Sequence, residues 1–229
     1  MNTYGVRPLA LREKKPNVGS INACLITHNN TLSEITDQYR SIRNHIRFSL
    51  DKEQLCTLAI TSASAGEGKT TAAVNLAISF AQHGERVLLV DANIKSPVLN
   101  HVFDIKPWPG LTDGLANHVD ILETIHQSSI ERLSVLPSGS SLPNASELLD
   151  SRGMETFLEL ARWRYDAVIF DCSSVLESSD TLALARRCSG AILVINSGKT
   201  QQKKALEAKK LLESANVKIV GGVLNKSKR

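Results

Sequence analysis

One stretch of eleven residues, TSASAGEGKTT at positions 61–71, constrains this chain more than any other feature of its sequence. It matches the glycine-rich phosphate-binding loop that ends in Gly-Lys-Thr, with Ala63 in place of the first glycine. An apolar run precedes it and a helical pattern follows, so it is predicted to join a strand to a helix. Such a loop turns backbone N–H groups around phosphate oxygens, and the helix adds about half a positive charge.

The side chains of this loop predict how a nucleotide and its metal are held. Lys69 places a full positive charge at the β- and γ-phosphates, and the short Thr70 hydroxyl is placed to bind Mg²⁺. The alternative is a glycine-rich turn with an incidental lysine, which the flanking strand and helix patterns disfavour. The residues predicted to bind the nucleotide here are Ala65, Gly66, Glu67, Gly68, Lys69, Thr70 and Thr71.

Beyond the loop, short β-branched runs alternate with longer helical patterns, which is typical of a largely parallel sheet. The runs VLLV at 87–90 and AVIF at 167–170 are apolar at every position, so helices must cover both faces. We therefore predict an α/β fold with a three-layer, doubly wound, mostly parallel sheet. The predicted strands are residues 57–62, 86–91, 132–136, 167–171, 191–195 and 217–224, and the predicted helices are 69–82, 151–162, 178–187 and 200–214.

Two of the predicted strands end in an aspartate, Asp91 and Asp171. Open α/β sheets bind their ligands at the carboxyl ends of the strands. Taken alone, a strand-end aspartate is more often the cap of a turn or helix. Because a triphosphate requires a metal and a metal requires anionic oxygens, the phosphate-binding loop favours a Mg²⁺ site for both carboxylates.

The N-terminal region divides into an extended arm, residues 1–30, and the start of a domain predicted to span 31–229. A helix is predicted from Ser33 onward. Its apolar stripe, which we expect to pack, consists of Ile35, Tyr39, Ile42, Ile46 and Leu50. A second stripe, expected to be free to bind, consists of Arg40, Arg43 and Arg47.

Composition places the chain among ordinary globular proteins, with 42% apolar and 22% charged residues and a length that favours one domain. No run approaches the roughly 18 to 20 apolar residues of a membrane helix, and the N-terminus has no apolar leader, so the cytoplasm is expected. The four cysteines are scattered, which predicts neither a zinc site nor disulfides. The net charge of +4 lies largely at the two ends and is interpreted as solvated tails.

Five ordered motifs resemble, over nearly the full length, the cytoplasmic domain of the bacterial tyrosine kinases (BY-kinases) that control capsule and exopolysaccharide synthesis. The P-loop is similar to theirs, and LLVDAN at 88–93 resembles their Walker A′ strand. The other three motifs are DQYRSIR at 37–43, GLTDGL at 110–115 and PNASELL at 143–149. The resemblance implies a P-loop NTPase fold of the Walker A′-containing branch and an ATP-dependent protein-tyrosine kinase.

The resemblance also implies roles for single residues. Lys69 would bind the phosphates, Asp91 would act as the catalytic base, and the metal set would be Thr70, Asp91, Asn93 and Asp171. Asp37, Arg40 and Arg43 would join subunits into a homo-oligomeric ring. The implied partners are a membrane-anchored polysaccharide co-polymerase that activates the kinase at the inner face of the membrane, and a tyrosine-bearing protein substrate, with no nucleic acid.

The sequence departs from the family pattern at the chemistry itself. Asn93 and Lys95 stand where the family has aspartate and arginine, and Cys172-Ser173-Ser174 replaces Thr-Pro-Pro. The C-terminal tyrosine cluster is absent, which leaves Tyr4 as a hypothetical minor acceptor. A nucleotide-dependent scaffold without kinase activity is therefore the alternative, and Asn225 is the candidate for adenine recognition.

Overall fold

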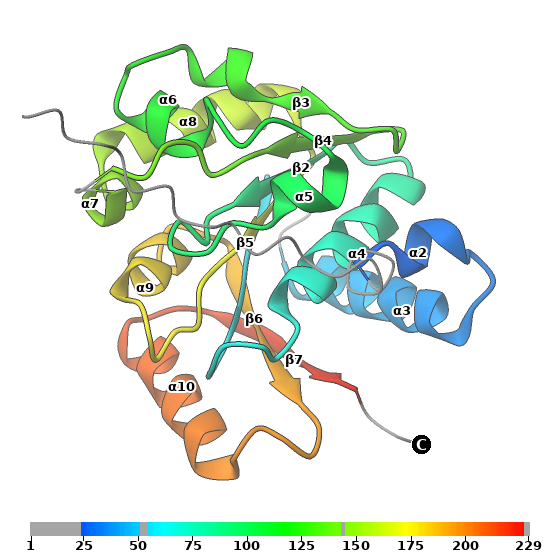
Figure 1. The fold of residues 1–229 in the computed structure, drawn as a ribbon. Coiled ribbons are helices and arrows are strands. Elements are labelled where there is room, and N and C mark those ends of the chain that lie inside the picture. The colour runs from blue at the N-terminus through cyan, green and yellow to red at the C-terminus, as the bar shows by residue number, and fades with distance from the viewer. Residues whose placement is uncertain (1–23, 51–54, 143–144, 227–229) are drawn as a thin grey trace, which may run out of the picture.

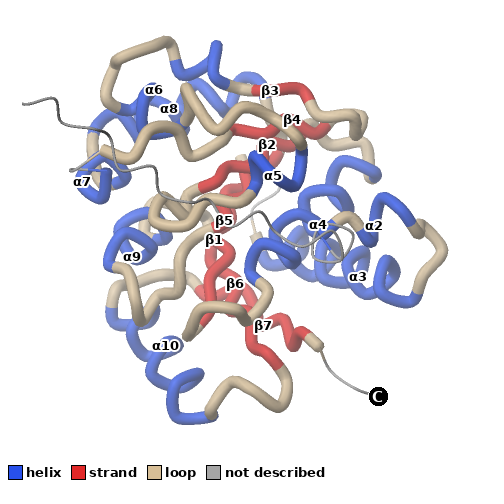
Figure 2. Tube along the Cα trace, viewed as in Figure 1, coloured by secondary structure: helices blue, strands red, loops and turns tan. Residues whose placement is uncertain are grey.

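The computed structural model describes residues 24–50, 55–142 and 145–226 of the chain. Within these residues one seven-stranded sheet runs in the order β3-β4-β2-β5-β1-β6-β7, with helices on both sides (Figures 1 and 2). All neighbouring strands are parallel except β3, which pairs antiparallel with β4. The predicted three-layer, mostly parallel α/β sheet is confirmed. The strands are β1 (Cys56–Ser62), β2 (Val87–Asp91), β3 (His126–Gln127), β4 (Leu133–Leu136), β5 (Ala167–Asp171), β6 (Gly190–Asn196) and β7 (Ile219–Asn225).

The helices form two layers that bury opposite faces of the sheet. One apolar cluster joins α3 and α4 to the sheet, and the other joins α6, α8, α9 and α10 to its opposite face. Among the described residues, no helix is both long and apolar enough to cross a bilayer. The helical elements are α2 (Ile26–Asn29), α3 (Glu34–Ser49), α4 (Lys69–Gln82), α5 (Leu99–Phe103), α6 (Leu111–Leu115), the 3₁₀ helix η1 (Ile121–Thr124), α7 (Ala145–Leu149), α8 (Arg152–Arg164), α9 (Ser179–Ala185) and α10 (Gln202–Ser214).

The parallel registers place the two strand-end aspartates side by side. β5 lies between β1 and β2, and in this register Asp91 of β2 pairs with Asp171 of β5. Neighbouring strands lie about 4.8 Å apart, so the two carboxylates enter the same small region at the carboxyl edge. The loop from β1 into α4 leaves the sheet at that same edge, which brings the predicted phosphate and metal residues together.

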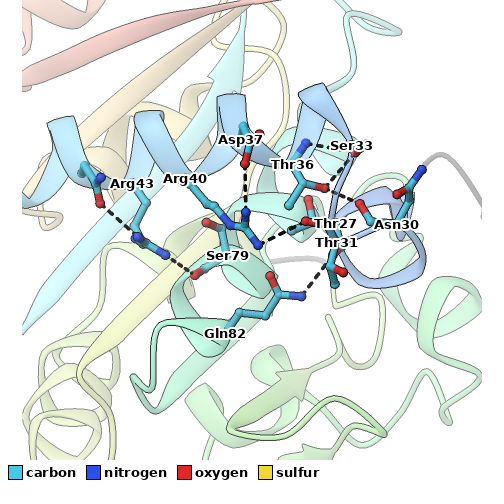
Figure 3. Close-up of polar contacts among 11 residues, drawn as sticks. Thr27, Asn30, Thr31, Ser33, Thr36, Asp37, Arg40, Arg43, Ser79 and Gln82 are labelled. Carbon is cyan, nitrogen blue, oxygen red and sulfur yellow. Dashed lines mark hydrogen bonds and ion pairs between the residues drawn. The ribbon is translucent and has the colours of Figure 1, made fainter.

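Helix α3 packs with a different face from the one that its sequence predicted. Tyr39 and Ile46 are buried as expected, but Ile35 is 43% exposed and Arg43 only 8% exposed. Arg43 Nη1 donates to the carbonyl oxygen of Ser79 in α4, 2.9 Å away (Figure 3). The prediction that Arg43 lies on a free binding stripe is therefore wrong, because its guanidinium caps a backbone carbonyl of the neighbouring helix.

The last part of the predicted N-terminal arm is helical and packed. Residues 26–29 form α2, and the Thr27 amide donates to Asn75 Oδ1 of α4 at 2.8 Å. Gln82 of α4 in turn donates to the Thr27 carbonyl oxygen at 3.0 Å (Figure 3). A four-residue helix gives almost no periodic signal, so the sequence pattern could not show it. The rest of the arm, including Tyr4, lies outside the described residues.

Candidate nucleotide site

The P-loop takes the left-handed backbone turns that its glycines permit. Gly66 has φ of 75° and Gly68 has φ of 97°, and Gly68 is the N-cap residue of α4. The amides of Gly66 and Gly68 donate to no acceptor among the described residues. Two unpaired donors beside a helix N-terminus are suited to bind an anion.

Hydrogen bonds of Glu67, within the P-loop, and of Asn225, outside it, hold the loop in place. Glu67 is only 3% exposed, and its carboxylate accepts from the Ser64 amide at 3.2 Å and from Thr200 Oγ1 at 2.6 Å. Asn225, at the end of β7, donates through Nδ2 to the Glu67 carbonyl oxygen at 3.0 Å. The Glu67 side chain is thus occupied within the protein, and only its backbone remains for the predicted role in nucleotide binding.

From the first turn of α4, the Lys69 side chain contacts the loop after β5, and the Thr70 side chain contacts the last residue of β5. Lys69 Nζ lies 3.5 Å from Ser174 Oγ, and Thr70 Oγ1 donates to Asp171 Oδ2 at 2.6 Å. Asp171 has no exposed surface, and its Oδ1 has no hydrogen-bond partner among the described residues. Burial and the nearby Asp91 charge raise the pKa of Asp171 to about 7. A buried carboxylate oxygen without a partner is costly, and a cation would relieve that cost.

Asp91 accepts hydrogen bonds from three backbone amides, as a cap does, and it also lies next to Asp171 at the strand ends. Its Oδ2 accepts from the amides of Val98 and Leu99, both at 2.9 Å, and its Oδ1 accepts from the Asn93 amide at 3.2 Å. Burial raises the pKa of Asp91 to about 6, while these three bonds act in the opposite direction. A carboxylate offers about four lone-pair positions, so one remains for a metal or a substrate proton.

The Asn93 side chain links the two strand-end loops. Its Oδ1 accepts from Ser173 Oγ at 2.7 Å, and its Nδ2 donates to the Ser96 carbonyl oxygen at 2.8 Å. Asn93 and Ser173, two of the residues that depart from the family pattern, therefore contact each other. The sequence showed both departures but could not show that they form a pair.

A cavity of about 580 Å³ opens beside these groups and is the space available for a ligand. Glu67, Asp91 and Asp171 are buried and do not line it, and neither do the α3 residues Asp37, Arg40 and Arg43. The predicted site residues that do line it are Ala65, Gly66, Gly68, Lys69, Thr70, Thr71, Asn93 and Asn225.

Residues that were not predicted as site residues also line this cavity, and four of them precede the P-loop in the chain: Cys24, Ile26, Ile35 and Tyr39. Cys24 is held by a 3.6 Å contact between its Sγ and Thr71 Oγ1, and Tyr39 is only 8% exposed. Burial raises the pKa of Tyr39 to about 12, so its hydroxyl stays protonated at neutral pH. These residues come from elements before the P-loop in the chain, and no local motif marks them.

The donor set fits a nucleotide with Mg²⁺ better than a cage of protein ligands. Among the described residues, no group of three or more histidine, cysteine or acidic side chains is arranged so that it could hold a metal ion by itself. Mg²⁺ usually takes one or two carboxylates and completes its octahedron with phosphate oxygens and water. Thr70, Asp171 and the remaining position on Asp91 are the residues that would hold it.

Gly68→Ala tests how closely the P-loop packs against Asn225. A Cβ at this position would lie 1.9 Å from Asn225 Nδ2, on a backbone with φ of 97°. We expect a loss of about 2 kcal/mol in the free energy of unfolding, together with loss of nucleotide binding. Gly84→Ala is the matched control, because Gly84 has φ of 95° but nothing within 4 Å of the added carbon. Thermal unfolding in which both variants lose the same stability would contradict the proposed clash.

Comparison with known proteins agrees with the nucleotide site that the geometry indicates. The family described as "AAA domain" matches residues 56–215. The chain is 37% identical over 220 residues to the tyrosine-protein kinase YwqD of Bacillus subtilis (strain 168), which covers 96% of this chain and 92% of that protein. The crystal structure of the chimerical protein CapA2B2 superposes with a TM-score of 0.86 at 32% identity, covering 90% of this chain and 91% of that one.

A second solved structure agrees. The kinase domain of the Escherichia coli tyrosine kinase ETK superposes with a TM-score of 0.82 at 28% identity, covering 90% of this chain and 82% of that one. The relatedness extends beyond the P-loop to almost the whole fold. The chain therefore belongs to the AAA domain family and, within it, to the bacterial protein-tyrosine kinases.

Proposed function

We propose that this chain transfers the terminal phosphate of ATP to a tyrosine hydroxyl of a protein substrate, with Mg²⁺, in the control of capsule or exopolysaccharide synthesis. The observation that carries the proposal is that Lys69 and Thr70 line one cavity, and that Thr70 is bonded to Asp171, whose Oδ1 has no hydrogen-bond partner among the described residues. The family membership supports the acceptor class.

The roles of the residues follow from phosphoryl-transfer chemistry. The amides of Gly66 and Gly68 and the Lys69 ammonium group hold the phosphates, and bound Mg²⁺ would neutralise part of their charge. Asp91 would orient the phenol and accept its proton. Burial raises the pKa of Asp91, which makes its carboxylate a stronger base than an ordinary aspartate.

The test is phosphotyrosine formation by the purified chain with Mg-ATP and a tyrosine-bearing protein. Since we also propose a membrane-anchored activator that holds the kinase at the inner face of the membrane, the assay includes the cytoplasmic segment of that partner. Phosphotyrosine that disappears in Asp91→Ala supports the proposal, and peptide mapping shows whether Tyr4 is an acceptor. Nucleotide binding without phosphotyrosine in the complete mixture would instead favour the scaffold. The Asn93 side chain supports that alternative, because both ends of its amide are already hydrogen-bonded within the protein.

We further propose that α3 carries a surface for assembly into a ring. Arg40 and Asp37 form an exposed pair, with 2.8 Å between Arg40 Nη1 and Asp37 Oδ1, whereas Arg43 is buried against α4 (Figure 3). The structure thus leaves Asp37 and Arg40 available for a neighbouring subunit, and gives Arg43 the role of joining α3 to the helix that follows the P-loop.

Arg40→Glu is expected to weaken self-association without unfolding the chain. Reversing the charge places two acids one helical turn apart, which costs only a few tenths of a kcal/mol within the helix. A like charge facing a neighbouring subunit costs more. Sedimentation velocity measures the change, and Arg162→Glu on α8 is the control for a reversed exposed charge. Equal assembly of Arg40→Glu and the wild type would remove Arg40 from the interface.

A further inference from the structure

A carboxylate outside the predicted site contacts the P-loop at its exposed end. Glu177 Oε1 accepts from the Ala65 amide at 3.2 Å, and its Oε2 accepts from Ser174 Oγ at 2.9 Å. The same Ser174 oxygen lies 3.5 Å from Lys69 Nζ. Glu177 is therefore linked through two hydrogen bonds to an amide of the loop and, through Ser174, to the ammonium group that binds phosphates.

The position of Glu177 is fixed by the loop that follows β5. The Val175 amide donates to the Ser62 carbonyl oxygen at 2.9 Å, and Thr61 Oγ1 donates to the Ser173 carbonyl oxygen at 2.7 Å. The Glu177 amide then donates back to the Ser174 carbonyl oxygen at 3.0 Å and closes a turn. The carboxylate is thus held on a loop that is bonded to β1 immediately before the P-loop.

Glu177 differs from the other acid of the P-loop region in what balances its charge. Glu67 is buried and satisfied within the protein, whereas Glu177 is exposed and forms no ion pair among the described residues. Its negative charge therefore acts on whatever binds beside Ala65 and Lys69. A carboxylate next to a phosphate group is repelled by it, and the two compete for the same amide and ammonium donors.

We propose that Glu177 sets the preference of the site between nucleoside diphosphates and triphosphates. This inference rests on the proposed nucleotide site. Lys69 meets the terminal phosphates, so a γ-phosphate brings its charge closest to Glu177, while a diphosphate ends further from it. Glu177 accordingly weakens the binding of the triphosphate and leaves the diphosphate almost unaffected.

The test compares the dissociation constants of Mg-ADP and of a non-hydrolysable Mg-ATP analogue by calorimetry, for the wild type and Glu177→Gln. Glutamine keeps an acceptor for the Ala65 amide and removes the charge. We expect about tenfold tighter binding of the triphosphate analogue and less than about a twofold change for ADP. Glu159→Gln, an exposed acid on α8, is the control and leaves both constants unchanged. The gain in the variant shrinks at high salt, because an exposed charge is screened.

The outcomes separate this inference from the function on which it rests. If the wild type binds neither nucleotide, the proposed site itself is wrong. If the wild type binds ADP and Glu177→Gln changes both nucleotides equally, or weakens the triphosphate, then Glu177 does not select between them. Thermal unfolding of the variant shows that the protein is folded in each case.

Discussion

Lys69→Met is expected to lower phosphotransfer by roughly a thousandfold or more, the largest effect on catalysis that we predict for a single residue. The ammonium group lies at the start of α4, where the residue is only 9% exposed and close to Ser174. In this largely buried position the effective dielectric constant is low, so a positive charge stabilises developing negative charge far better than it does in water. Methionine keeps the length and the apolar stem of the side chain, so the fold should persist.

Phosphotyrosine formation in the complete mixture measures this effect, and calorimetry with Mg-ADP shows how much of it is lost binding. Lys204→Met on the exposed surface of α10 is the control for removing a lysine charge. Activity in Lys69→Met within tenfold of the wild type would mean that the phosphates bind elsewhere.

The sequence predicted the central elements accurately because these elements are buried along nearly their whole length, and burial selects apolar residues. The predicted bounds of α4 and β5 coincide with the observed Lys69–Gln82 and Ala167–Asp171. α4 is buried on nearly all sides between the sheet and α3, and β5 is buried along its whole length. Residues 72–74 and 76–78 of α4 and residues 167–170 of β5 are accordingly apolar, and apolar runs near a glycine loop or ended by an aspartate are strong signals. The two-residue strand β3 was missed because it is too short to have a period.

The arrangement around the site was harder to predict because it depends on contacts between distant parts of the chain. The pair of Asn93 and Ser173 joins positions 80 apart, and the bond from Glu177 to the P-loop joins positions 112 apart. Arg43 was misplaced for a related reason. Arginine at a helical position predicts an exposed charge, unless a carbonyl oxygen such as that of Ser79 accepts from it inside the fold.

Asp171→Asn is expected to remove most of the stabilisation that Mg-ADP gives to the wild type, which is the second large effect. With Mg-ADP the wild type should gain several degrees in melting temperature, whereas the variant should gain little. Asparagine offers one neutral oxygen where the buried carboxylate offers a charge, and Mg²⁺ binds anionic oxygen much more strongly. Thr70 retains an acceptor in the variant, so the loop itself is not expected to unfold.

Without metal, the effect of Asp171→Asn has the opposite sign and depends on pH. The pKa of Asp171 is raised to about 7 in the folded chain, from an ordinary value near 3.8. The folded state therefore binds more protons than the unfolded state between about pH 4 and pH 7, and the wild type loses stability as the pH rises through that window. Asparagine does not titrate, and its removal of charge also relieves Asp91. In EDTA the variant should exceed the wild type by a few kcal/mol at pH 8 and match it near pH 4.

Asp104→Asn provides the control, since Asp104 is exposed and its φ of 51° suits asparagine equally well. Unfolding at pH 4, 6 and 8, in EDTA and in Mg-ADP, separates the two contributions of Asp171. A variant that is less stable than the wild type in EDTA at pH 8 would show that the carboxylate is stabilised by its surroundings even without a cation. The buried acid would then be a structural group. A variant that is more stable in EDTA but no longer stabilised by Mg-ADP would place the cation at this strand end, because only a group that is unfavourable without its ligand gives both signs.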